Sequence, residues 1–176
     1  ALTKPSTAVR LPVGLAATST MLVPASLSLR VNPWTASVTV LLALVVTSPE
    51  IARTLKRPIV AVRGTGEAIK HTDGGRIDLS YTGARHAGAR AFEMAGVTPA
   101  DIKYASIYDS FTITVLMQLE DLGFCEKGQG GRFVADGNLI SGVGKLPFNT
   151  DGGGLCSNHP SNRGGMTKVI EAVRQL

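Results

Sequence analysis

The sequence contains few cysteines, few aromatic residues and no acidic residue before Glu50. Its two cysteines, Cys125 and Cys156, form no CxxC pair and have no histidine at metal-ligand spacing, which argues against a disulfide framework and a zinc site. Such cysteine usage is typical of a cytoplasmic protein. The longest apolar run, residues 38–46, is far shorter than the roughly 20 residues that a membrane-spanning helix needs. We therefore expect no metal, no membrane span and a cytoplasmic location.

The charge distribution gives no sign of nucleic-acid binding. The formal net charge is +5, from 18 basic and 13 acidic residues, and three of the basic residues lie in the acid-free head. The remainder is close to neutral, and no stretch interleaves Lys or Arg with stacking aromatic side chains. With 176 residues, of which 44% are hydrophobic and 18% charged, the composition is typical of a globular domain with its own core.

Residues 1–41 differ from the rest of the chain. They are rich in Ala, Ser, Thr, Val and Leu, and four prolines interrupt them, which breaks long helices. We therefore expect an atypical head segment at 1–41 and one domain at 42–176. A replaced or out-of-frame origin of the head is one hypothesis, and a divergent but genuine segment is the other. Translation of the coding DNA in its other two reading frames would distinguish these two hypotheses.

Sequence periodicity predicts alternating helices and strands after the head. Ser48 and Pro49 have the chemistry of a helix start, for a short helix that ends near residue 56. A buried strand is predicted over 58–64. A second short strand over 103–108 alternates, with Tyr104, Ser106 and Tyr108 on one face and Asp109 directed to the opposite side. Asp136-Gly137 predicts a turn. Helices are predicted over 82–95, over 111–122 and after residue 165. The helix over 111–122 is predicted to turn one face inward, formed by Phe111, Val115, Leu119 and Leu122. The helix over 82–95 carries a small-residue stripe formed by Ala84, Ala87, Ala91 and Met94. The last helix is predicted to bury Met166, Val169, Ile170 and Val173.

The most informative stretch is NTDGGGLCSNHPSNRGG, residues 149–165, which ends where the last helix begins. It contains three successive glycines, Gly152, Gly153 and Gly154. Glycines allow positive φ and close approach of the backbone to a ligand. His159 precedes a helix start, whose free amides favour a developing oxyanion and a neutral imidazole, which can accept a proton. The alternatives are a structural glycine loop with a capping histidine, or a self-contained hydrolase pair of Cys156 and His159.

Two motifs in this order resemble the thiolase superfamily. The order NTDGGG, NHP and a Gly-Gly helix start is similar to the segment around the family's Gly-His-Pro motif, with Asn158 in place of its glycine. Upstream, IYDSF at 107–111 resembles the second family motif, Asn-Glu-Ala-Phe in most thiolases and His-Asp-Cys-Phe in the sterol-carrier-protein type. The run GVTPADIKYASIYDSFTITVLMQLEDLGFC is similar to that second type. The resemblance begins near residue 42 and covers only the C-terminal half of a thiolase.

The resemblance implies an α/β fold with three α/β/α layers and a mixed sheet, of which this chain forms the C-terminal half. It implies that His159 deprotonates a cysteine in the other half of the protein, and that Tyr108 stands where the family has Asn or His. A phenol is protonated at neutral pH, so Tyr108 can donate a hydrogen bond or a proton but is a poor base. A tyrosine merely packed at a strand end is the alternative. Contacts with the bound thioester are expected at Gly152, Gly153, Gly154 and Asn158.

The expected function is thiolytic cleavage of a 3-oxoacyl-CoA or the reverse Claisen condensation, with coenzyme A as a substrate and no covalently bound cofactor. One alternative is a thiolase-like acyl-CoA retro-aldolase that uses Tyr108, and another is a non-catalytic module that binds acyl-CoA or lipid. As an incomplete half, the chain is expected to be inactive alone. The expected partners are a second copy or a small OB-fold, zinc-ribbon subunit, since some relatives of this subgroup pair with one.

Overall fold

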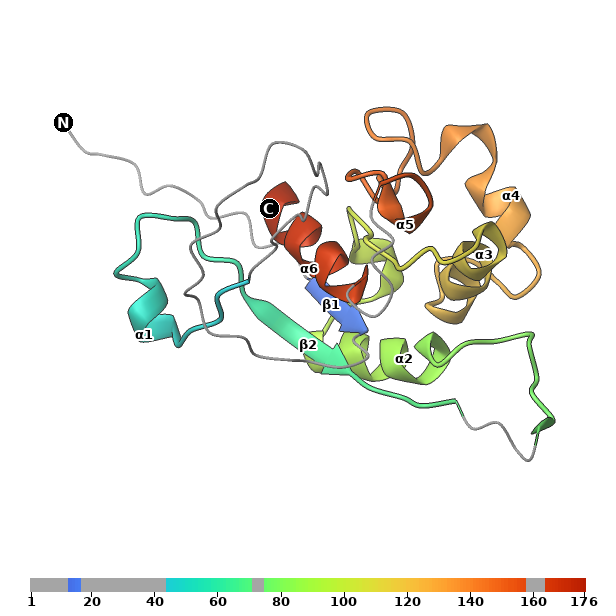
Figure 1. Ribbon diagram of the computed structural model, residues 1–176, viewed down its shortest axis with the longest axis horizontal. Helices are drawn as coiled ribbons and strands as arrows, with labels where there is room; N and C mark the ends of the chain where they lie inside the picture. Colours follow the sequence, from blue (N-terminus) through green and yellow to red (C-terminus); the bar gives the residue numbers. More distant parts are fainter. Residues whose placement is uncertain (1–12, 17–43, 71–74, 158–163) are drawn as a thin grey trace, which may run out of the picture.

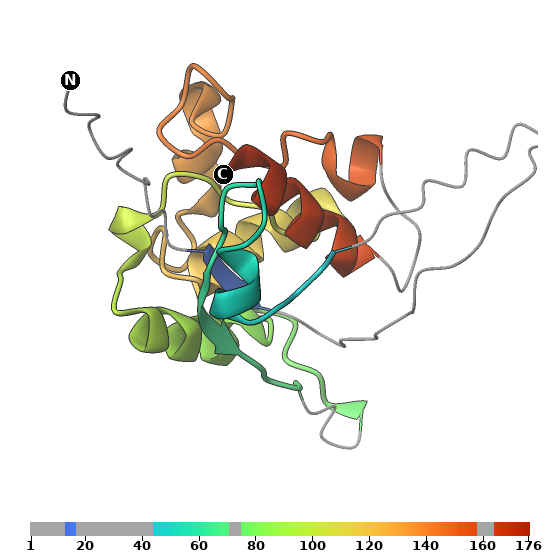
Figure 2. The same ribbon diagram turned by 90° about the vertical axis from the view of Figure 1, so that its left-hand side faces the viewer.

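The computed structural model describes residues 13–16, 44–70, 75–157 and 164–176. The elements of these ranges, in chain order, are β1 (Val13–Ala16), α1 (Pro49–Ala52), β2 (Val62–Gly66), α2 (Ala84–Ala95), η2 (Pro99–Asp101), α3 (Thr112–Asp121), α4 (Gly130–Val134), η3 (Ala135–Gly137), α5 (Gly153–Cys156) and α6 (Gly164–Gln175). In Figures 1 and 2 the two strands lie between α2 on one side and α6 on the other. None of the described helices is long and apolar enough to cross a membrane.

The strands β1 and β2 form a parallel pair, in which Gly14 lies opposite Gly64 and Ala16 opposite Gly66. Because β1 comes from residues 13–16, part of the head joins the sheet, while the rest of the head lies outside the described residues. Elsewhere in the described chain, one isolated parallel bridge joins Ala105 to Phe148. This mixture of helices and strands fits the expected α/β class. The wider mixed sheet and the three-layer arrangement stay predictions.

The strand β2 packs on α2 through backbone contact. A Cβ added to Gly64 would lie 3.0 Å from the Ala95 nitrogen, and one added to Gly66 would lie 2.7 Å from the Ala87 carbonyl carbon. The prediction of a buried strand over 58–64 was wrong in position and in burial, since the side chain of Ile59 is 56% exposed. The reason is that the close contact with α2 is made by the glycines, and the apolar residues precede them.

Helix α2 presents a face of small residues, as predicted, although its members differ. The buried residues are Ala87, Gly88, Ala91 and Ala95. Met94, expected in this stripe, is instead 65% exposed, because the contact with β2 runs through Ala91 and Ala95. Gly96 ends the helix with a φ of 66°, a left-handed conformation that glycine adopts without steric cost.

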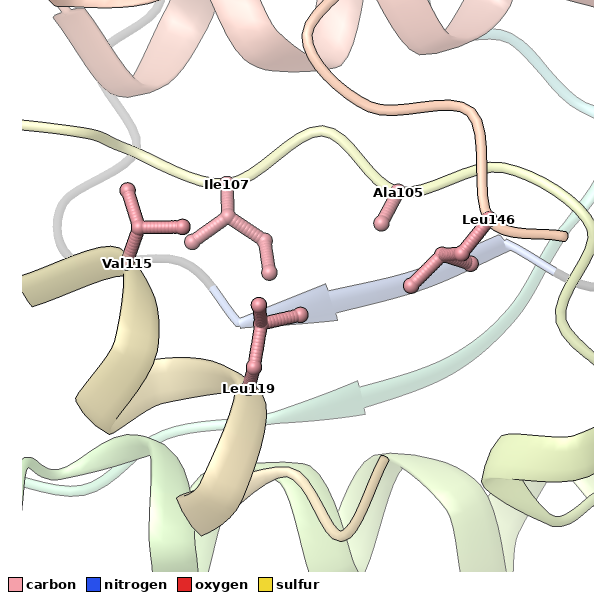
Figure 3. Packing of buried hydrophobic residues seen from close by; sticks show 5 residues of the cluster. All are labelled: Ala105, Ile107, Val115, Leu119 and Leu146. Carbon is pink, nitrogen blue, oxygen red and sulfur yellow. The ribbon is translucent and has the colours of Figure 1, made fainter. Parts of the chain in front are cut away.

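The apolar core lies between α3, the extended segment before it and the segment that carries Leu146. Figure 3 shows its five buried residues, Ala105, Ile107, Val115, Leu119 and Leu146. Val115 and Leu119 confirm the predicted inner face of α3. Phe111, predicted on the same face, is 67% exposed, because it is the N-cap residue and its side chain points away from the core.

Capping and turn residues predicted some ends of helices correctly and others incorrectly. The side chain of Ser48 accepts a hydrogen bond from the Ile51 amide at 3.5 Å, which confirms the predicted start of α1. The helix ends at Ala52 rather than near residue 56. Asp136 and Gly137 form the predicted turn, with φ values of 56° and 74°.

Candidate functional site

Residues 103–109 run extended toward the candidate site and alternate in burial. Ala105, Ile107 and Asp109 are buried, and the residues between them, including Tyr108, are half-buried. This is the alternation that the sequence predicts, although a ladder forms only at the Ala105 bridge. Tyr108 and Asp109 therefore lie on opposite sides of the same segment.

Asn149 forms hydrogen bonds with the backbone of residues 105–107, as a neighbouring strand would. Its side-chain oxygen accepts a hydrogen bond from the Ile107 amide at 2.9 Å, and its side-chain nitrogen donates to the Ile107 carbonyl at 2.8 Å. Its own amide donates to the Ala105 carbonyl at 3.1 Å. The φ of Asn149 is 41°, in the left-handed region that Asn tolerates better than most residues. The first residue of the glycine loop thus holds the loop against the core.

The carboxylate of Asp109 binds backbone amides of the glycine loop. It accepts hydrogen bonds from the amides of Gly154 at 2.6 Å and Leu155 at 3.2 Å. Only 4% of Asp109 is exposed. Gly153 has a φ of 64°, and a Cβ there would lie 2.8 Å from the Asp109 carboxyl carbon and 2.9 Å from the Asn149 side-chain nitrogen. The chain's own side chains therefore require glycine at position 153.

The three glycines make their close approach to the protein itself. The Gly153 amide donates to the Asp151 carboxylate at 3.0 Å, and the next two amides are taken by Asp109. Gly152, with a φ of 89°, turns the backbone into α5. The predicted contact of Gly152, Gly153 and Gly154 with a thioester stays a prediction.

Tyr108 lies against the first residue of α6. A Cβ added to Gly164 would lie 2.7 Å from the Tyr108 Cζ, so the phenol ring covers this glycine. The backbone carbonyl of Tyr108 accepts a hydrogen bond from the Gln118 side chain at 2.9 Å. His159 and Asn158 belong to residues 158–163, which join α5 to α6 and lie outside the described residues. Their predicted roles, like that of Tyr108, stay predictions.

Helix α6 forms where the periodicity predicts it, but the buried face differs from the predicted one. Its buried residues are Gly164, Thr167, Lys168 and Glu171. The expected apolar face is only half-buried and consists of Met166, Val169, Ile170 and Val173. The prediction was wrong because α6 packs on the polar loop at 149–151 instead of on an apolar layer.

Two polar contacts tie α6 to this loop. The Lys168 ammonium lies 3.0 Å from the Asp151 carboxylate, and these side chains are 5% and 10% exposed. The Thr150 hydroxyl donates to the Glu171 carboxylate at 2.5 Å. Buried charges of this kind require a partner, because an unpaired charge in an apolar surrounding is costly. The NTD residues therefore act as the support of the glycine loop.

Sequence reasoning missed Thr150, Asp151, Lys168 and Glu171 as contributors to the site. A signal was present, because positions 164, 167, 168 and 171 follow the same i, i+3, i+4, i+7 spacing as an apolar helix face. Because three of these residues are polar, a search for apolar residues at helical spacing does not detect this face. A buried polar face becomes predictable only when its partner, here the NTD triplet, is known to lie opposite.

The other candidate nucleophiles and bases of the described chain lie in unremarkable settings. Cys125 is half-buried, and burial together with the charge of Glu120 raises the pKa of its thiol, which keeps the sulfur protonated and unreactive. Cys156 is exposed on α5. His86 is exposed on α2, with its ring edge toward Tyr81 at 6.3 Å between centroids.

A surface cavity of about 370 Å³ lies away from Tyr108, at the C-terminal end of α3. Its lining includes Asp121, which accepts hydrogen bonds from the Thr82 amide at 2.6 Å and from Lys127 at 2.9 Å. The Thr82 contact joins the start of α2 to the end of α3, and the Lys127 contact holds the segment after α3, so Asp121 has a structural role at this cavity. Among the described residues, no group of three His, Cys, Asp or Glu side chains is placed to hold a metal ion.

Comparison with known proteins identifies the family. Residues 66–176 match the family described as thiolase C-terminal domain-like. A steroid side-chain-cleaving aldolase of Thermomonospora curvata is 38% identical over 138 residues, which are 75% of this chain and 35% of that protein. An acetyl-CoA acetyltransferase of Methanothermobacter thermautotrophicus is 41% identical over 101 residues, 57% of this chain and 25% of that protein.

A solved structure shares the fold. The Ltp2-ChsH2(DUF35) aldolase superposes with a TM-score of 0.54 at 38% identity, covering 62% of this chain and 29% of that one. The chain therefore spans about a third or less of the length of the relatives it matches. The two motifs, the matched family and these relatives agree: this chain belongs to the thiolase superfamily, as a thiolase C-terminal domain-like member of the sterol-carrier-protein type.

Proposed function

We propose that the full-length protein cleaves a carbon–carbon bond of an acyl-CoA thioester in a retro-aldol reaction. The observation that carries this proposal is Tyr108, which lies at the end of the extended segment and against Gly164 at the start of α6. The family resemblance assigns this position to an oxyanion-binding Asn or His. A phenol there is a hydrogen-bond and proton donor. The 38% identity to a steroid side-chain-cleaving aldolase supports the same reaction class.

In a retro-aldol reaction of a 3-hydroxyacyl-CoA, a base takes the proton of the C3 hydroxyl. The C2–C3 bond then breaks, a carbonyl forms at C3, and the electron pair becomes the enolate of the shortened thioester. We assign the base to His159, which returns the proton to C2, so no proton is consumed overall. Tyr108 donates a hydrogen bond to the enolate oxygen as its charge develops. One such donor is typically worth about 10²- to 10³-fold in rate.

Thiolysis of a 3-oxoacyl-CoA, the reaction that the sequence led us to expect first, is the second candidate. The 41% identity to an acetyl-CoA acetyltransferase supports it. In this reaction His159 takes the proton of a cysteine from the other part of the protein, and the sulfur attacks the C3 carbonyl. The C2–C3 bond breaks, the shortened thioester leaves as an enolate that regains the proton at C2, and free CoA takes the acyl group from the cysteine, whose thiol is restored. Tyr108 donates a hydrogen bond to the oxyanion of the thioester. Both candidates use the same two side chains and differ in the substrate and the nucleophile.

Coenzyme A takes part in either reaction as the carrier of the substrate, near Gly152, Gly153, Gly154 and Asn158. Because the amides of residues 153–155 donate to Asp151 and Asp109, the loop would touch a thioester through its glycine Cα atoms. The solved aldolase is named for two components, Ltp2 and ChsH2, of which the second is of the DUF35 type. A hetero-oligomer with a small subunit of that type is the assembly we propose, with a homodimer as the alternative, and the cytoplasm as its location.

The test compares two assays on the full-length protein, co-expressed with its small subunit where one exists. One assay supplies a 3-hydroxyacyl-CoA, the other a 3-oxoacyl-CoA with free CoA, and mass spectrometry follows the shortened acyl-CoA. Tyr108→Phe should lower the active reaction by about 10²- to 10³-fold. Tyr104→Phe is the matched control, because Tyr104 lies on the same side of the segment and its hydroxyl contacts only Thr150 among the described partners, at 3.2 Å.

The two substrates separate the two candidates, because a retro-aldolase cleaves the 3-hydroxyacyl-CoA and a thiolase cleaves the 3-oxoacyl-CoA in the presence of free CoA. Tyr108→His tests whether a hydrogen-bond donor suffices at this position. Imidazole occupies it in the sterol-carrier-protein type, so the active reaction should lose less rate with histidine than with phenylalanine at position 108. His159→Ala should reduce either reaction by orders of magnitude without lowering the melting temperature. Full activity of Tyr108→Phe on both substrates would refute the chemical role of Tyr108.

A further inference from the structure

Two consecutive residues hold the two helices that border the candidate site. Tyr108 packs against Gly164 at the start of α6, and Asp109 accepts hydrogen bonds from Gly154 and Leu155 in α5. Since neighbouring side chains of an extended segment point to opposite sides, one backbone position determines both contacts. A shift of this segment would move the phenol and the carboxylate together.

The carboxylate contact is buried and closely fitted. Asp109 is 4% exposed, its shorter hydrogen bond measures 2.6 Å, and Gly153 leaves no room for a Cβ beside it. Charge-assisted hydrogen bonds to a carboxylate are about twice as strong as neutral ones. Asp109 therefore connects the end of the Tyr108 segment to α5 through two charge-assisted hydrogen bonds.

We propose that Asp109 is a positioning residue for Tyr108. By anchoring the segment to α5, its carboxylate fixes the backbone from which the phenol reaches over Gly164 to the reacting thioester. This inference rests on the proposed function, in which the Tyr108 hydroxyl donates to a developing oxyanion. A displacement of about 1 Å in such a donor can cost about 10²-fold in rate.

The substitution Asp109→Asn probes this role with little change of shape. The amide keeps one acceptor oxygen, but its NH₂ group faces the second backbone donor, so one of the two hydrogen bonds is replaced by a repulsive contact. The segment should still fold, because Asn149 holds Ile107 through two hydrogen bonds and Gln118 holds the Tyr108 carbonyl. The loss is therefore local to the anchor.

The experiment is a double-mutant cycle in the full-length protein, with kcat and KM measured on the substrate that the wild type cleaves. Asp109→Asn should lower kcat by about 10- to 100-fold and leave KM within about twofold. In the Tyr108→Phe background the same substitution should have almost no further effect, because the group it positions is already gone. Asp136→Asn is the control, since Asp136 is exposed and its φ of 56° suits Asn.

Two outcomes would overturn the positioning role while leaving the proposed function intact. One is an Asp109→Asn variant with wild-type kcat. The other is an equal loss of kcat in the wild-type and Tyr108→Phe backgrounds, which would show that Asp109 acts independently of Tyr108. A wild-type protein inactive on both substrates would instead refute the proposed function, and with it any role of Asp109 in that reaction.

Discussion

Replacement of Gly153 by alanine should be among the most damaging small changes in this chain. The residue has a φ of 64°, where an alanine costs about 1 to 2 kcal/mol in backbone strain. The added methyl group would also occupy the place of the Asp109 carboxylate, whose carboxyl carbon lies 2.8 Å from it. Displacing a buried carboxylate from a backbone amide costs about 1 to 3 kcal/mol. We expect a total destabilisation of roughly 2 to 5 kcal/mol.

Alanine substitutions at two other glycines serve as references for the loss of stability in Gly153→Ala. Gly131, in α4, has nothing within 4 Å of an added Cβ, so Gly131→Ala should be neutral or stabilising by up to about 1 kcal/mol. Gly152 has a φ of 89°, but its nearest neighbour is the Ser157 Cβ at 3.1 Å, so its alanine variant should fall between the two. Urea denaturation of the full-length protein, followed by circular dichroism, ranks them. A Gly153→Ala variant as stable as Gly131→Ala would refute the closed geometry of the loop.

Two further predictions concern charged side chains. Lys168→Met should destabilise the protein by about 3 kcal/mol, because the Asp151 carboxylate, 10% exposed, loses its ammonium partner and keeps only the hydrogen bond from the Gly153 amide; a melting temperature unchanged from wild type would contradict this. The pKa of Glu120 lies below its usual 4.5, because the amides of Gly130 and Gly128 donate to its carboxylate. A lowered pKa contributes stability above pH 4.5 that is lost as the pH falls through the folded-state value. Glu120→Gln should therefore lower the urea midpoint at neutral pH, with the difference from wild type shrinking in acid; a constant difference at every pH would exclude ionisation as the cause.

The sequence predicts those features that depend on local chemistry. The alternation that places Tyr108 and Asp109 on opposite sides, and the turn at Asp136, follow from short-range rules. The face of α6 does not, because its buried side is set by partners near residue 150. A periodicity analysis considers only apolar residues, so it predicted the wrong face of α6 to be buried.

The glycine loop shows the same limit more sharply. Three successive glycines led us to expect close approach of the backbone to a ligand, and that contact stays a prediction, whereas the structure places the protein's own side chains against Gly152 and Gly153. The sequence cannot specify whether the neighbour is a ligand or the protein itself. Here Asp109 is that neighbour, 44 residues upstream of Gly153, and no local pattern reports a contact over such a separation.

The contact between β2 and α2 limits how this part of the molecule can change. Gly64 and Gly66 leave no space for a Cβ before the backbone of α2, so the separation of strand and helix is as small as two main chains allow. Any larger residue at either position must push the helix outward as a whole. Because Asp121 holds the amide of Thr82, just before α2, such a movement would also pull on α3. A substitution at Gly64 or Gly66 would therefore act on α3 as well as on α2, although neither glycine contacts α3 through an added Cβ.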